Sequence, residues 1–358
     1  MKRIGILTSG GDCGGLNAVV RAVTFRAIEK YNWEVFGIRD GTLGLMQRPI
    51  QYEKLTLNHF KGNLIRQGGT FLGTTSSGNP FRFLMKDGSY RDQSNKIIEG
   101  YKELNLDAFI GIGGDGSMKI LKKLSQKGNL NFVGIPKTID NDVNLTEISI
   151  GYDTAVEVAT NALDMLQPTA ASHKRLMILE VMGRDAGHIA LNAGIAGGAD
   201  IILIPEISYS LKNIARHIED IRSHGRNHAL MIVAESVKKE DGTKAKIKHS
   251  DGQVRLGGIG AYLSYKIQKL TNTETRVTVL GHLQRGSQPS SRDRLVASAF
   301  GIHAVDMIAK KKFNRIVVWQ NREVKDVSLN EVINKSKKVN PNGPLVKTAK
   351  SLGIYIGN

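Results

Sequence analysis

Two acidic turns in the sequence carry the residue types that phosphate chemistry needs. Asp115 lies in the segment GIGGDGS, residues 111–117, and Asp140 lies in PKTIDND, residues 136–142. A carboxylate in a glycine-rich turn can hold a Mg²⁺ ion that bridges phosphate oxygens. A second carboxylate can accept the proton of an attacking hydroxyl group. Together the two turns indicate phosphoryl transfer to an alcohol, with Asp140 as the base.

A third turn, TSGGDCGGLN at residues 8–17, places four glycines within six residues. Glycine lets backbone N–H groups approach an anion closely, and a helix beginning near Leu16 would add its positive N-terminal end. An ordinary turn between a strand and a helix also uses glycine. Four glycines exceed what such a turn requires, so we expect this loop to contact phosphate.

Each acidic turn has an alternative interpretation. The Asp115 turn contains G-x-G-x-x-G, which is typical of dinucleotide sites. There the Asp115 carboxylate would repel the pyrophosphate, and the next apolar run, residues 132–135, ends without a ribose-binding acid. A metal–nucleotide loop is therefore favoured. For Asp140 and Asp142, an Asx turn without chemistry remains open when the segment is taken alone.

The elements that must position these turns are short apolar strands alternating with helices, which predicts an α/β fold of two doubly wound, Rossmann-like domains with parallel-rich sheets. Ligands in such folds bind at the carboxyl ends of the strands, so the three turns could converge. The expected strands are residues 3–8, 35–38, 108–112, 132–135, 176–180, 201–204, 229–234, 276–280 and 315–319, and the expected helices include 16–30, 117–126, 154–166, 211–223 and 261–271.

Composition excludes several classes of protein. No apolar run approaches the roughly 18 residues of a membrane helix, the N-terminus does not read as a signal peptide, and the single cysteine, Cys13, permits no intrachain disulfide. We therefore expect a cytoplasmic protein without a membrane partner. The net charge of +17 is dispersed and aromatic residues make up only 6%, so we expect no nucleic-acid partner and relate part of the charge to anionic substrates.

The three turns together resemble the active-site loops of the 6-phosphofructokinases. Further matches follow in that family's order and extend the resemblance over nearly the whole chain: Arg175, Met182-Gly183-Arg184, Glu235, Arg276 and the segment GHLQRG at residues 281–286. The resemblance implies an ATP-dependent 6-phosphofructokinase of glycolysis. Such an enzyme uses Mg²⁺ and ATP to phosphorylate the 1-hydroxyl of fructose 6-phosphate.

The resemblance also implies roles on the sugar side. Asp140 would be the catalytic base, and Arg184 would stabilise the transferring group. Glu235 would hydrogen-bond a sugar hydroxyl, and four cationic side chains would clamp the 6-phosphate: Arg175, Arg276, His282 and Arg285. The full set of implied sugar-binding residues is Thr138, Ile139, Asp140, Arg175, Met182, Gly183, Arg184, Glu235, Arg276, His282, Leu283, Gln284 and Arg285.

On the donor side, the resemblance implies that Asp115 holds Mg²⁺ and that backbone groups cradle the ATP phosphates. The family usually has an arginine shortly after residue 73, and this chain has none there before Arg82. Either Arg82 reaches the donor, or Lys137 supplies the charge, or the contact is absent; we favour Lys137. The implied donor-side residues are Gly11, Arg82, Gly114, Asp115, Gly116, Ser117 and Lys137.

The donor itself is decided by two positions. Family members that use pyrophosphate generally have Asp at the position of Gly116 and Lys at the position of Lys137, whereas ATP users have Gly at the first. This chain has Gly116 with Lys137, a mixed signature. We expect ATP, because an Asp at residue 116 would occupy and repel the nucleotide's α-phosphate. A pyrophosphate-dependent phosphofructokinase is the alternative.

The resemblance further implies two domains with the active site between them. The larger, ATP-binding domain would comprise residues 1–151 plus 284–335, and the smaller, sugar-binding domain residues 152–283 plus 336–358. We expect a homo-oligomer, with a tetramer favoured and a dimer as the alternative, in which Arg175 and Arg276 act across subunits. Other readings are a lipid or NAD kinase, which lacks the segments around Arg184 and His282, and a regulatory or nucleic-acid-binding protein on the same fold.

Overall fold

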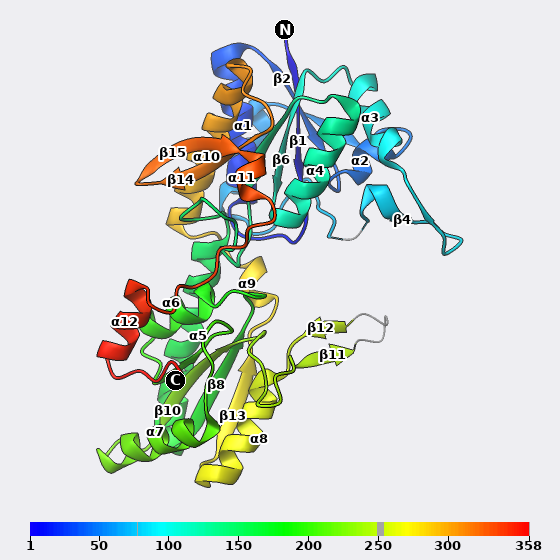
Figure 1. Ribbon diagram of the computed structural model, residues 1–358. Coiled ribbons are helices and arrows are strands. Elements are labelled where there is room, and N and C mark those ends of the chain that lie inside the picture. Colours follow the sequence, from blue (N-terminus) through cyan, green and yellow to red (C-terminus); the bar gives the residue numbers. More distant parts are fainter. Residues whose placement is uncertain (77, 249–253, 358) are drawn as a thin grey trace. The chain divides into compact units, whose positions relative to one another are not determined.

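The computed structural model describes residues 1–76, 78–248 and 254–357, and the chain forms two compact units (Figure 1). Unit 1 consists of Met1–Ile139, Val143–Thr154 and Arg285–Ser336. Unit 2 consists of Asp140–Asp142, Ala155–Gln284 and Lys337–Asn358. The expected domain boundaries lie within a few residues of these divisions, apart from the three-residue piece Asp140–Asp142.

Unit 1 is built on a seven-stranded sheet in the order β15-β14-β7-β6-β1-β2-β3. The strands are parallel except at the two edges, where β3 and β15 run antiparallel to their neighbours. The central strands are apolar and buried on both faces, as parallel strands covered by helices must be. The strands are β1 (Arg3–Thr8), β2 (Glu34–Ile38), β3 (Tyr52–Leu55), β6 (Ala108–Gly113), β7 (Phe132–Pro136), β14 (Arg315–Gln320) and β15 (Glu323–Ser328).

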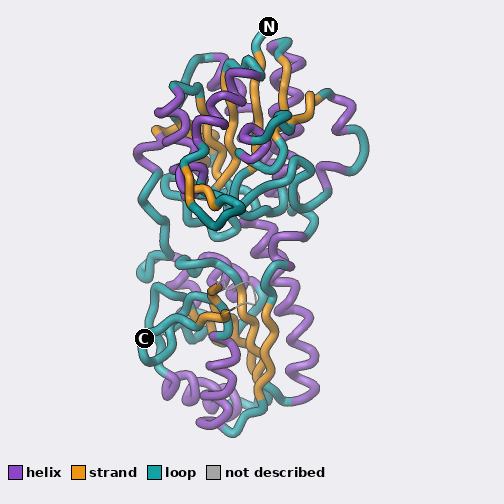
Figure 2. The backbone as a smooth tube through the Cα atoms, turned by 90° about the vertical axis from the view of Figure 1, so that its right-hand side faces the viewer, coloured by secondary structure: helices purple, strands orange, loops and turns teal. Residues whose placement is uncertain are grey.

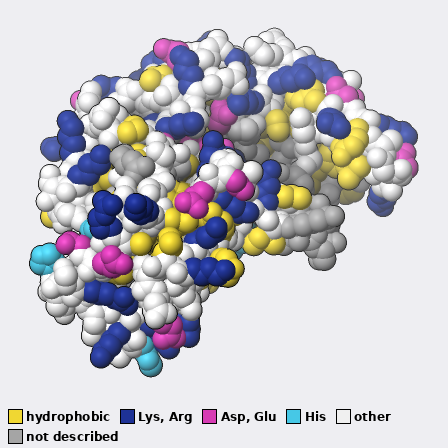
Figure 3. Space-filling view, turned by 60° about the horizontal axis from the view of Figure 1, so that its bottom comes forward, with side chains coloured by type: hydrophobic (Ala, Val, Ile, Leu, Met, Phe, Trp, Pro, Cys, Tyr) yellow, Lys and Arg dark blue, Asp and Glu magenta, His cyan; other side chains and the backbone are white. Residues whose placement is uncertain are grey.

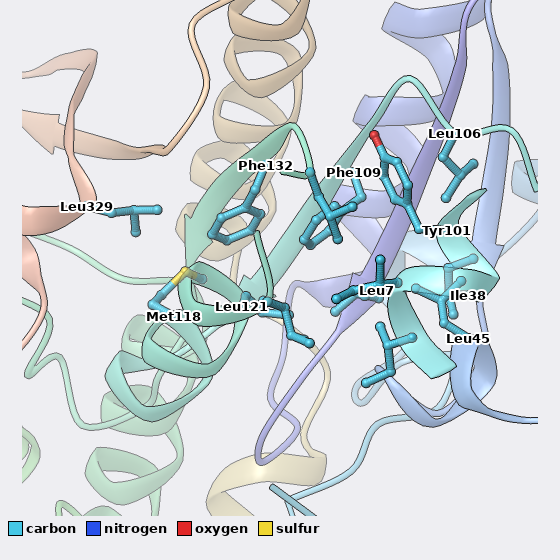
Figure 4. Close-up of a cluster of buried hydrophobic side chains, with 14 of the residues drawn as sticks. Leu7, Ile38, Leu45, Tyr101, Leu106, Phe109, Met118, Leu121, Phe132 and Leu329 are labelled. Atoms are coloured by element: carbon cyan, nitrogen blue, oxygen red, sulfur yellow. The ribbon is translucent and has the colours of Figure 1, made fainter. Parts of the chain in front are cut away.

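Helices lie on both faces of this sheet (Figure 2). On one face, α1 runs beside α10 over its length. On the other face, an aromatic and aliphatic cluster fills the space between the sheet and α3, α4 and α11, with Phe109 and Phe132 stacked at 4.9 Å between ring centroids (Figure 4). The helices are α1 (Leu16–Phe25), α2 (Leu43–Met46), α3 (Ser94–Glu103), α4 (Asp115–Gly128), α10 (Ser291–Ala309) and α11 (Leu329–Val332), and a small hairpin comprises β4 (Phe83–Leu84) and β5 (Tyr90–Arg91).

Unit 2 is built on a four-stranded, fully parallel sheet in the order β13-β8-β10-β9. The strands are β8 (Leu176–Val181), β9 (Ile201–Leu203), β10 (Ala229–Ala234) and β13 (Thr275–Val279), with a separate hairpin of β11 (Lys246–Lys248) and β12 (Val254–Leu256). The helices are α5 (Tyr152–His173), α6 (His188–Ala196), α7 (Leu211–Ser223), α8 (Ile259–Thr271), α9 (Leu283–Gly286) and α12 (Pro344–Ser351). The chain passes from unit 1 to unit 2 within the first turn of α5.

The structure confirms the expected fold class of two parallel-rich α/β units, and each expected strand is present to within one or two residues. Two parts of the chain differ from what the sequence indicated. The edge strands β3 and β15 were not predicted, because polar residues occupy every second position or more. The polar and charged stretch at residues 237–252 contains β11, and residues 249–252 lie outside the described part of the chain.

Candidate active site

The three predicted turns begin at the carboxyl ends of β1, β6 and β7, which are neighbours in the sheet of unit 1. Because parallel strands end at the same edge, the turns lie side by side. Backbone hydrogen bonds join them at their bases: Ser9 N–H donates to the Ile112 carbonyl at 2.9 Å, and Lys137 N–H donates to the Gly113 carbonyl at 3.0 Å. The bases of the three turns therefore lie together in unit 1, whereas Asp140–Asp142 of the third turn belong to unit 2.

The first turn is contacted by two cationic side chains. Nζ of Lys137, a side chain only 3% exposed, donates to the Gly11 carbonyl. Arg285 Nη1 donates to the Asp12 carbonyl at 3.0 Å and lies against Gly11, where an added Cβ would come within 2.7 Å of it. A side chain at residue 11 would therefore displace the flexible end of Arg285. The Arg285 guanidinium contacts the first turn of unit 1, and its expected contact with a sugar phosphate stays a prediction.

The second turn leads into α4. Asp115 is the first residue of the helix, and its carboxylate is paired with Lys119 Nζ at 2.5 Å and accepts the Asn334 N–H at 3.3 Å. At Gly116 the backbone φ is not positive, and an added Cβ would meet no atom within 4 Å. Neither backbone strain nor packing in the described chain explains a glycine there. A side chain at residue 116 would therefore extend into open space.

The two candidates for the missing donor-side cation are placed differently. Arg82 is exposed at the end of a short 3₁₀ helix, with its guanidinium 4.4 Å from the centre of the Tyr90 ring. Lys137 instead contacts the first glycine turn, as described above. The geometry therefore favours Lys137 over Arg82 as a charge beside the donor turns.

A second group of predicted residues comes together in unit 2. Asp140 is 4% exposed, and its Oδ2 lies 3.8 Å from Arg184 Nε. The Arg184 backbone N–H donates to Glu235 Oε1 at 3.1 Å. Arg184 and Glu235 follow β8 and β10, which are adjacent, so the parallel register again brings them to one edge. Most of the Arg184 side chain, 73%, is exposed, which leaves its guanidinium accessible to a ligand.

Burial raises the pKa of Glu235 above its usual value, and the nearby charges of Asp140 and Glu180 raise it further. Two carboxyl groups, those of Asp140 and Glu235, thus lie beside Arg184. Asn141 and Arg184 both have positive φ values, 50° and 48°. Asparagine adopts such φ values readily, whereas an arginine does so less often.

The remaining residues that were predicted to bind the sugar phosphate are either buried in the fold or exposed to solvent. Gln284 is wholly buried, and its Oε1 accepts the Met182 N–H at 2.8 Å, so its main contact holds the end of β8. The Ile139 side chain is also wholly buried, which leaves only its backbone to face a ligand, and Thr138 is 9% exposed. His282 and Leu283 are exposed between β13 and α9. The backbone of Gly183 has φ 149°, and an added Cβ would meet the Ala186 carbonyl at 2.7 Å.

Arg175 and Arg276 lie at the opposite edge of the unit 2 sheet. Arg175 precedes β8 and pairs with Glu274 at 2.9 Å, while Arg276 near the start of β13 pairs with the same Glu274 oxygen. A strand rises about 3.3 Å per residue, so six-residue β8 separates Arg175 from Met182 by roughly 20 Å. Within one chain, these arginines are not part of the group formed by Asp140, Arg184 and Glu235.

Sequence reasoning missed one residue close to the first turn. Asp293 is wholly buried and accepts the backbone N–H groups of Gly151 and Thr154. Its only signal in the sequence was the spacing of Ser290 and Asp293, which is typical of a helix N-terminus. The hydrogen bond from Thr154 crosses 139 residues of sequence, which no local pattern reports.

Two further observations bear on the alternatives. No described helix is long and apolar enough to cross a membrane. On the face seen in Figure 3, Lys and Arg side chains are interspersed with Asp and Glu side chains and form no single continuous block. A nucleic-acid interface typically concentrates Lys and Arg side chains on one surface, and the face in Figure 3 shows no such concentration.

Comparison with known proteins gives a consistent result. Residues 3–308 match the family described as phosphofructokinase. The chain is 59% identical over 356 residues, 99% of both chains, to ATP-dependent 6-phosphofructokinase 1 of Nostoc sp. (strain PCC 7120), and 56% identical over 358 residues, 100% of this chain and 99% of the other, to ATP-dependent 6-phosphofructokinase 1 of Synechocystis sp. (strain PCC 6803). A crystal structure of Pichia pastoris phosphofructokinase in the T-state superposes with a TM-score of 0.80 at 29% identity, covering 92% of this chain and 35% of that longer one.

The electrostatics of Glu235 give a testable prediction about stability. A carboxyl group whose pKa is higher in the folded than in the unfolded chain contributes stability below its unfolded value, 4.5, and loses that contribution as the pH rises through the raised pKa. Glu235→Gln keeps an acceptor for the Arg184 N–H and removes the buried charge. We expect the variant to be more stable than the wild type at pH 8 by roughly 1 kcal/mol.

Thermal unfolding at pH 8 and pH 4 measures this difference. The advantage of Glu235→Gln should shrink at pH 4, where the wild-type carboxyl group is protonated. The exposed acid Glu219→Gln on α7 is the control and should show no such pH dependence. An equal advantage at both pH values would contradict the prediction.

Proposed function

The chain belongs to the phosphofructokinase family, and on this premise we propose that it transfers the γ-phosphoryl group of ATP to the 1-hydroxyl of fructose 6-phosphate, giving fructose 1,6-bisphosphate. The observation that carries the proposal is the buried Asp140 carboxylate beside the accessible Arg184 guanidinium. The full-length similarity to relatives named ATP-dependent 6-phosphofructokinase supports the choice of donor and acceptor.

In the proposed reaction, Asp140 accepts the proton of the sugar's 1-hydroxyl as its oxygen attacks the γ-phosphorus. Charge on the transferring group is spread over its equatorial oxygens, and Arg184 neutralises part of that charge. When ionised, Glu235 accepts a hydrogen bond from another sugar hydroxyl and so orients the ring. Its pKa, raised by burial, is consistent with a group that faces a polar ligand only when the substrate is bound.

On the donor side, the proposal assigns the ATP phosphates to the glycine turns of unit 1. Backbone groups of Gly11 and of residues 114–117 would line the phosphates, and the N-terminal end of α4 adds positive potential. The open space beside Gly116 supports a nucleotide whose phosphate lies close to the backbone there. Lys137, held on the Gly11 carbonyl, would supply the cationic contact that the missing arginine gives in relatives.

The side chains in the donor turns suit a magnesium ion that arrives with the nucleotide. Within the described residues no cluster of three or more His, Cys, Asp or Glu side chains could hold a metal alone. Mg²⁺ is commonly bound by one or two carboxylates together with substrate phosphates and water. Asp115, 30% exposed at the start of α4, fits that role once its ion pair with Lys119 opens. The metal would neutralise charge on the β- and γ-phosphates.

The positions of Arg175 and Arg276 support a homo-oligomeric enzyme. Both side chains lie roughly 20 Å from the end of β8 that carries Arg184, yet they gather around one glutamate, Glu274. We infer that they bind the 6-phosphate in the site of a neighbouring subunit. A tetramer is favoured and a dimer would also satisfy this arrangement.

The first test of the proposal is an activity matrix in which ATP, GTP and pyrophosphate are each offered with fructose 6-phosphate, sedoheptulose 7-phosphate and tagatose 6-phosphate. We expect turnover with ATP and fructose 6-phosphate, and a loss of about 10²–10⁴-fold in kcat for Asp140→Asn, as is usual for removal of a general base. Asp142→Asn is the matched control in the same turn and should lose less. If the wild type turns over with pyrophosphate and not with ATP, the pyrophosphate-dependent alternative is favoured. An unchanged kcat in Asp140→Asn would show that Asp140 is not the catalytic base.

A second test concerns the donor. Gly116→Asp should fold like the wild type, because its side chain meets open space, but its carboxylate should repel the nucleotide and raise the KM for ATP at least about tenfold, or 1.4 kcal/mol. Gly116→Ala, which adds a methyl group without charge, separates steric from electrostatic effects. Wild-type ATP kinetics in Gly116→Asp would place the nucleotide elsewhere.

A third test uses mixed subunits. Arg175→Ala and Asp140→Asn should each be inactive or nearly so, because one lacks the phosphate clamp and the other the base. After the two are unfolded together and refolded, hybrids contain sites in which an intact Asp140 meets an intact Arg175 from the neighbour. Recovery of a substantial fraction of wild-type activity is expected. No recovery, with oligomers verified by light scattering, would contradict action across subunits.

A further inference from the structure

A buried carboxylate on α10 holds the turn from which α5 starts. Asp293 Oδ1 accepts the Gly151 N–H at 2.9 Å, and Oδ2 accepts the Thr154 N–H at 2.8 Å and the Thr154 hydroxyl at 2.5 Å. All of these atoms belong to unit 1. Gly151 has no side chain with which to cap α5, so a side chain from a distant helix provides the acceptors that a capping residue normally supplies.

The starts of α5 and α10 hold each other in place. Ser290 caps α10 by accepting the Asp293 N–H at 3.1 Å, and its hydroxyl donates to Asp153 at 2.8 Å. The Ser290 N–H donates to the Thr154 hydroxyl oxygen at 3.0 Å. Two positive helix ends therefore meet two carboxylates, Asp153 and Asp293, which is the favourable placement of charge at helix N-termini.

The first glycine turn rests directly on this junction. Cys13 Sγ donates to the Ile150 carbonyl at 3.5 Å. A Cβ added at Gly14 would lie 3.0 Å from the Thr154 hydroxyl oxygen, and one added at Gly15 would lie 2.9 Å from Ile150 and 3.5 Å from the Asp293 Cβ. No side chain fits between the turn and its support. A shift of the junction would therefore move the backbone of the turn.

Asp293 is a buried carboxyl group surrounded by hydrogen-bond donors. Burial raises its pKa to about 6, and the hydrogen bonds from Thr154 and Gly151 oppose that rise. An amide in its place would accept at only one oxygen and would turn its NH₂ group toward a backbone N–H donor. The carboxylate is thus the group that satisfies all three donors at once.

We propose that Asp293 is a positioning residue for the phosphoryl donor: it fixes residues 150–154 beneath the first glycine turn, and through them the backbone that cradles the donor's phosphates. This proposal rests on the assignment of that turn to the donor under the proposed function. Asp293 itself touches no substrate. Its loss should weaken donor binding and leave sugar-phosphate binding in unit 2 unchanged.

The experiment compares Asp293→Asn with Asp306→Asn in the full-length protein. Asp306 is the matched control, because it lies on the same helix, accepts two hydrogen bonds from Arg26 and one from Tyr31, and has no part in the glycine turns. MgATP affinity is measured by titration calorimetry, and the KM values for ATP and fructose 6-phosphate by a coupled assay. We expect Asp293→Asn to bind MgATP about tenfold or more weakly, since small displacements of a positioning group have effects of this size.

The KM for fructose 6-phosphate should stay within about twofold in Asp293→Asn, and both substrates should behave as in the wild type with Asp306→Asn. Thr154 provides a second, independent variant pair. Thr154→Ser keeps the hydroxyl and should bind MgATP like the wild type, whereas Thr154→Val should follow Asp293→Asn. If Asp293→Asn fails to fold, the comparison of Thr154→Ser with Thr154→Val still tests the proposal.

Three results would overturn the proposal: wild-type MgATP affinity in both Asp293→Asn and Thr154→Val, equal weakening by Asp293→Asn and Asp306→Asn, or equal weakening of both substrates. If the wild type uses pyrophosphate and not ATP, the same comparison is made with pyrophosphate, because the same turn would bind it. A wild type that binds neither donor would overturn the proposed function as well.

Discussion

The parallel register of neighbouring strands is the constraint on which the candidate site depends. Because β1, β6 and β7 run in the same direction, their carboxyl ends share one edge, and turns that are about a hundred residues apart in sequence become neighbours. The same constraint acts in unit 2, where adjacent β8 and β10 bring Arg184 to Glu235. Neither group of residues needs a long loop to assemble it. The strands are stiff and buried, so their ends are held with little freedom.

The charged side chains of the candidate site differ in how far they are exposed to water. Asp140 and Lys137 are nearly buried and have fixed partners, whereas Arg184 is mostly exposed. A buried base is preorganised, and an exposed guanidinium can move to meet a developing charge. Two further arginines lie at the amino-terminal ends of the unit 2 strands and are paired differently. Arg175 and Arg276 converge on one carboxylate, that of Glu274, which holds two like charges close together.

Much of this could be predicted from the sequence, and the failures have physical reasons. Buried parallel strands are continuous apolar runs, so they were found to within a residue or two, while the edge strands β3 and β15 have exposed polar residues and resemble loops. The acidic and glycine turns were found because their composition is unusual. The contact of Arg285 with the Asp12 carbonyl was not predicted, because a motif fixes a residue's place in the chain and not the direction of a long side chain.

Lys137 and Asp293 show the other limit of sequence reasoning. The contact of Lys137 with Gly11 and that of Asp293 with Thr154 join residues 126 and 139 positions apart. Each depends on how helices and strands pack, and nothing local in the chain indicates the partner. Such contacts also determine what a side chain at a glycine position would meet. At residue 15 the backbone φ of 98° favours glycine and an added Cβ would lie 2.9 Å from Ile150, whereas at residue 11 it would displace only the flexible end of Arg285.

The route of the chain between the two units has a consequence for dissecting the protein. The chain changes unit after Ile139, Asp142, Thr154, Gln284 and Ser336, so each unit is assembled from three separate pieces. The piece that brings Asp140 into unit 2 is only three residues long and is tethered at both ends to unit 1. The shortest contiguous fragment that contains every piece of unit 2 is residues 140–358, and that for unit 1 is residues 1–336. Neither unit can therefore be produced as a single fragment without pieces of the other.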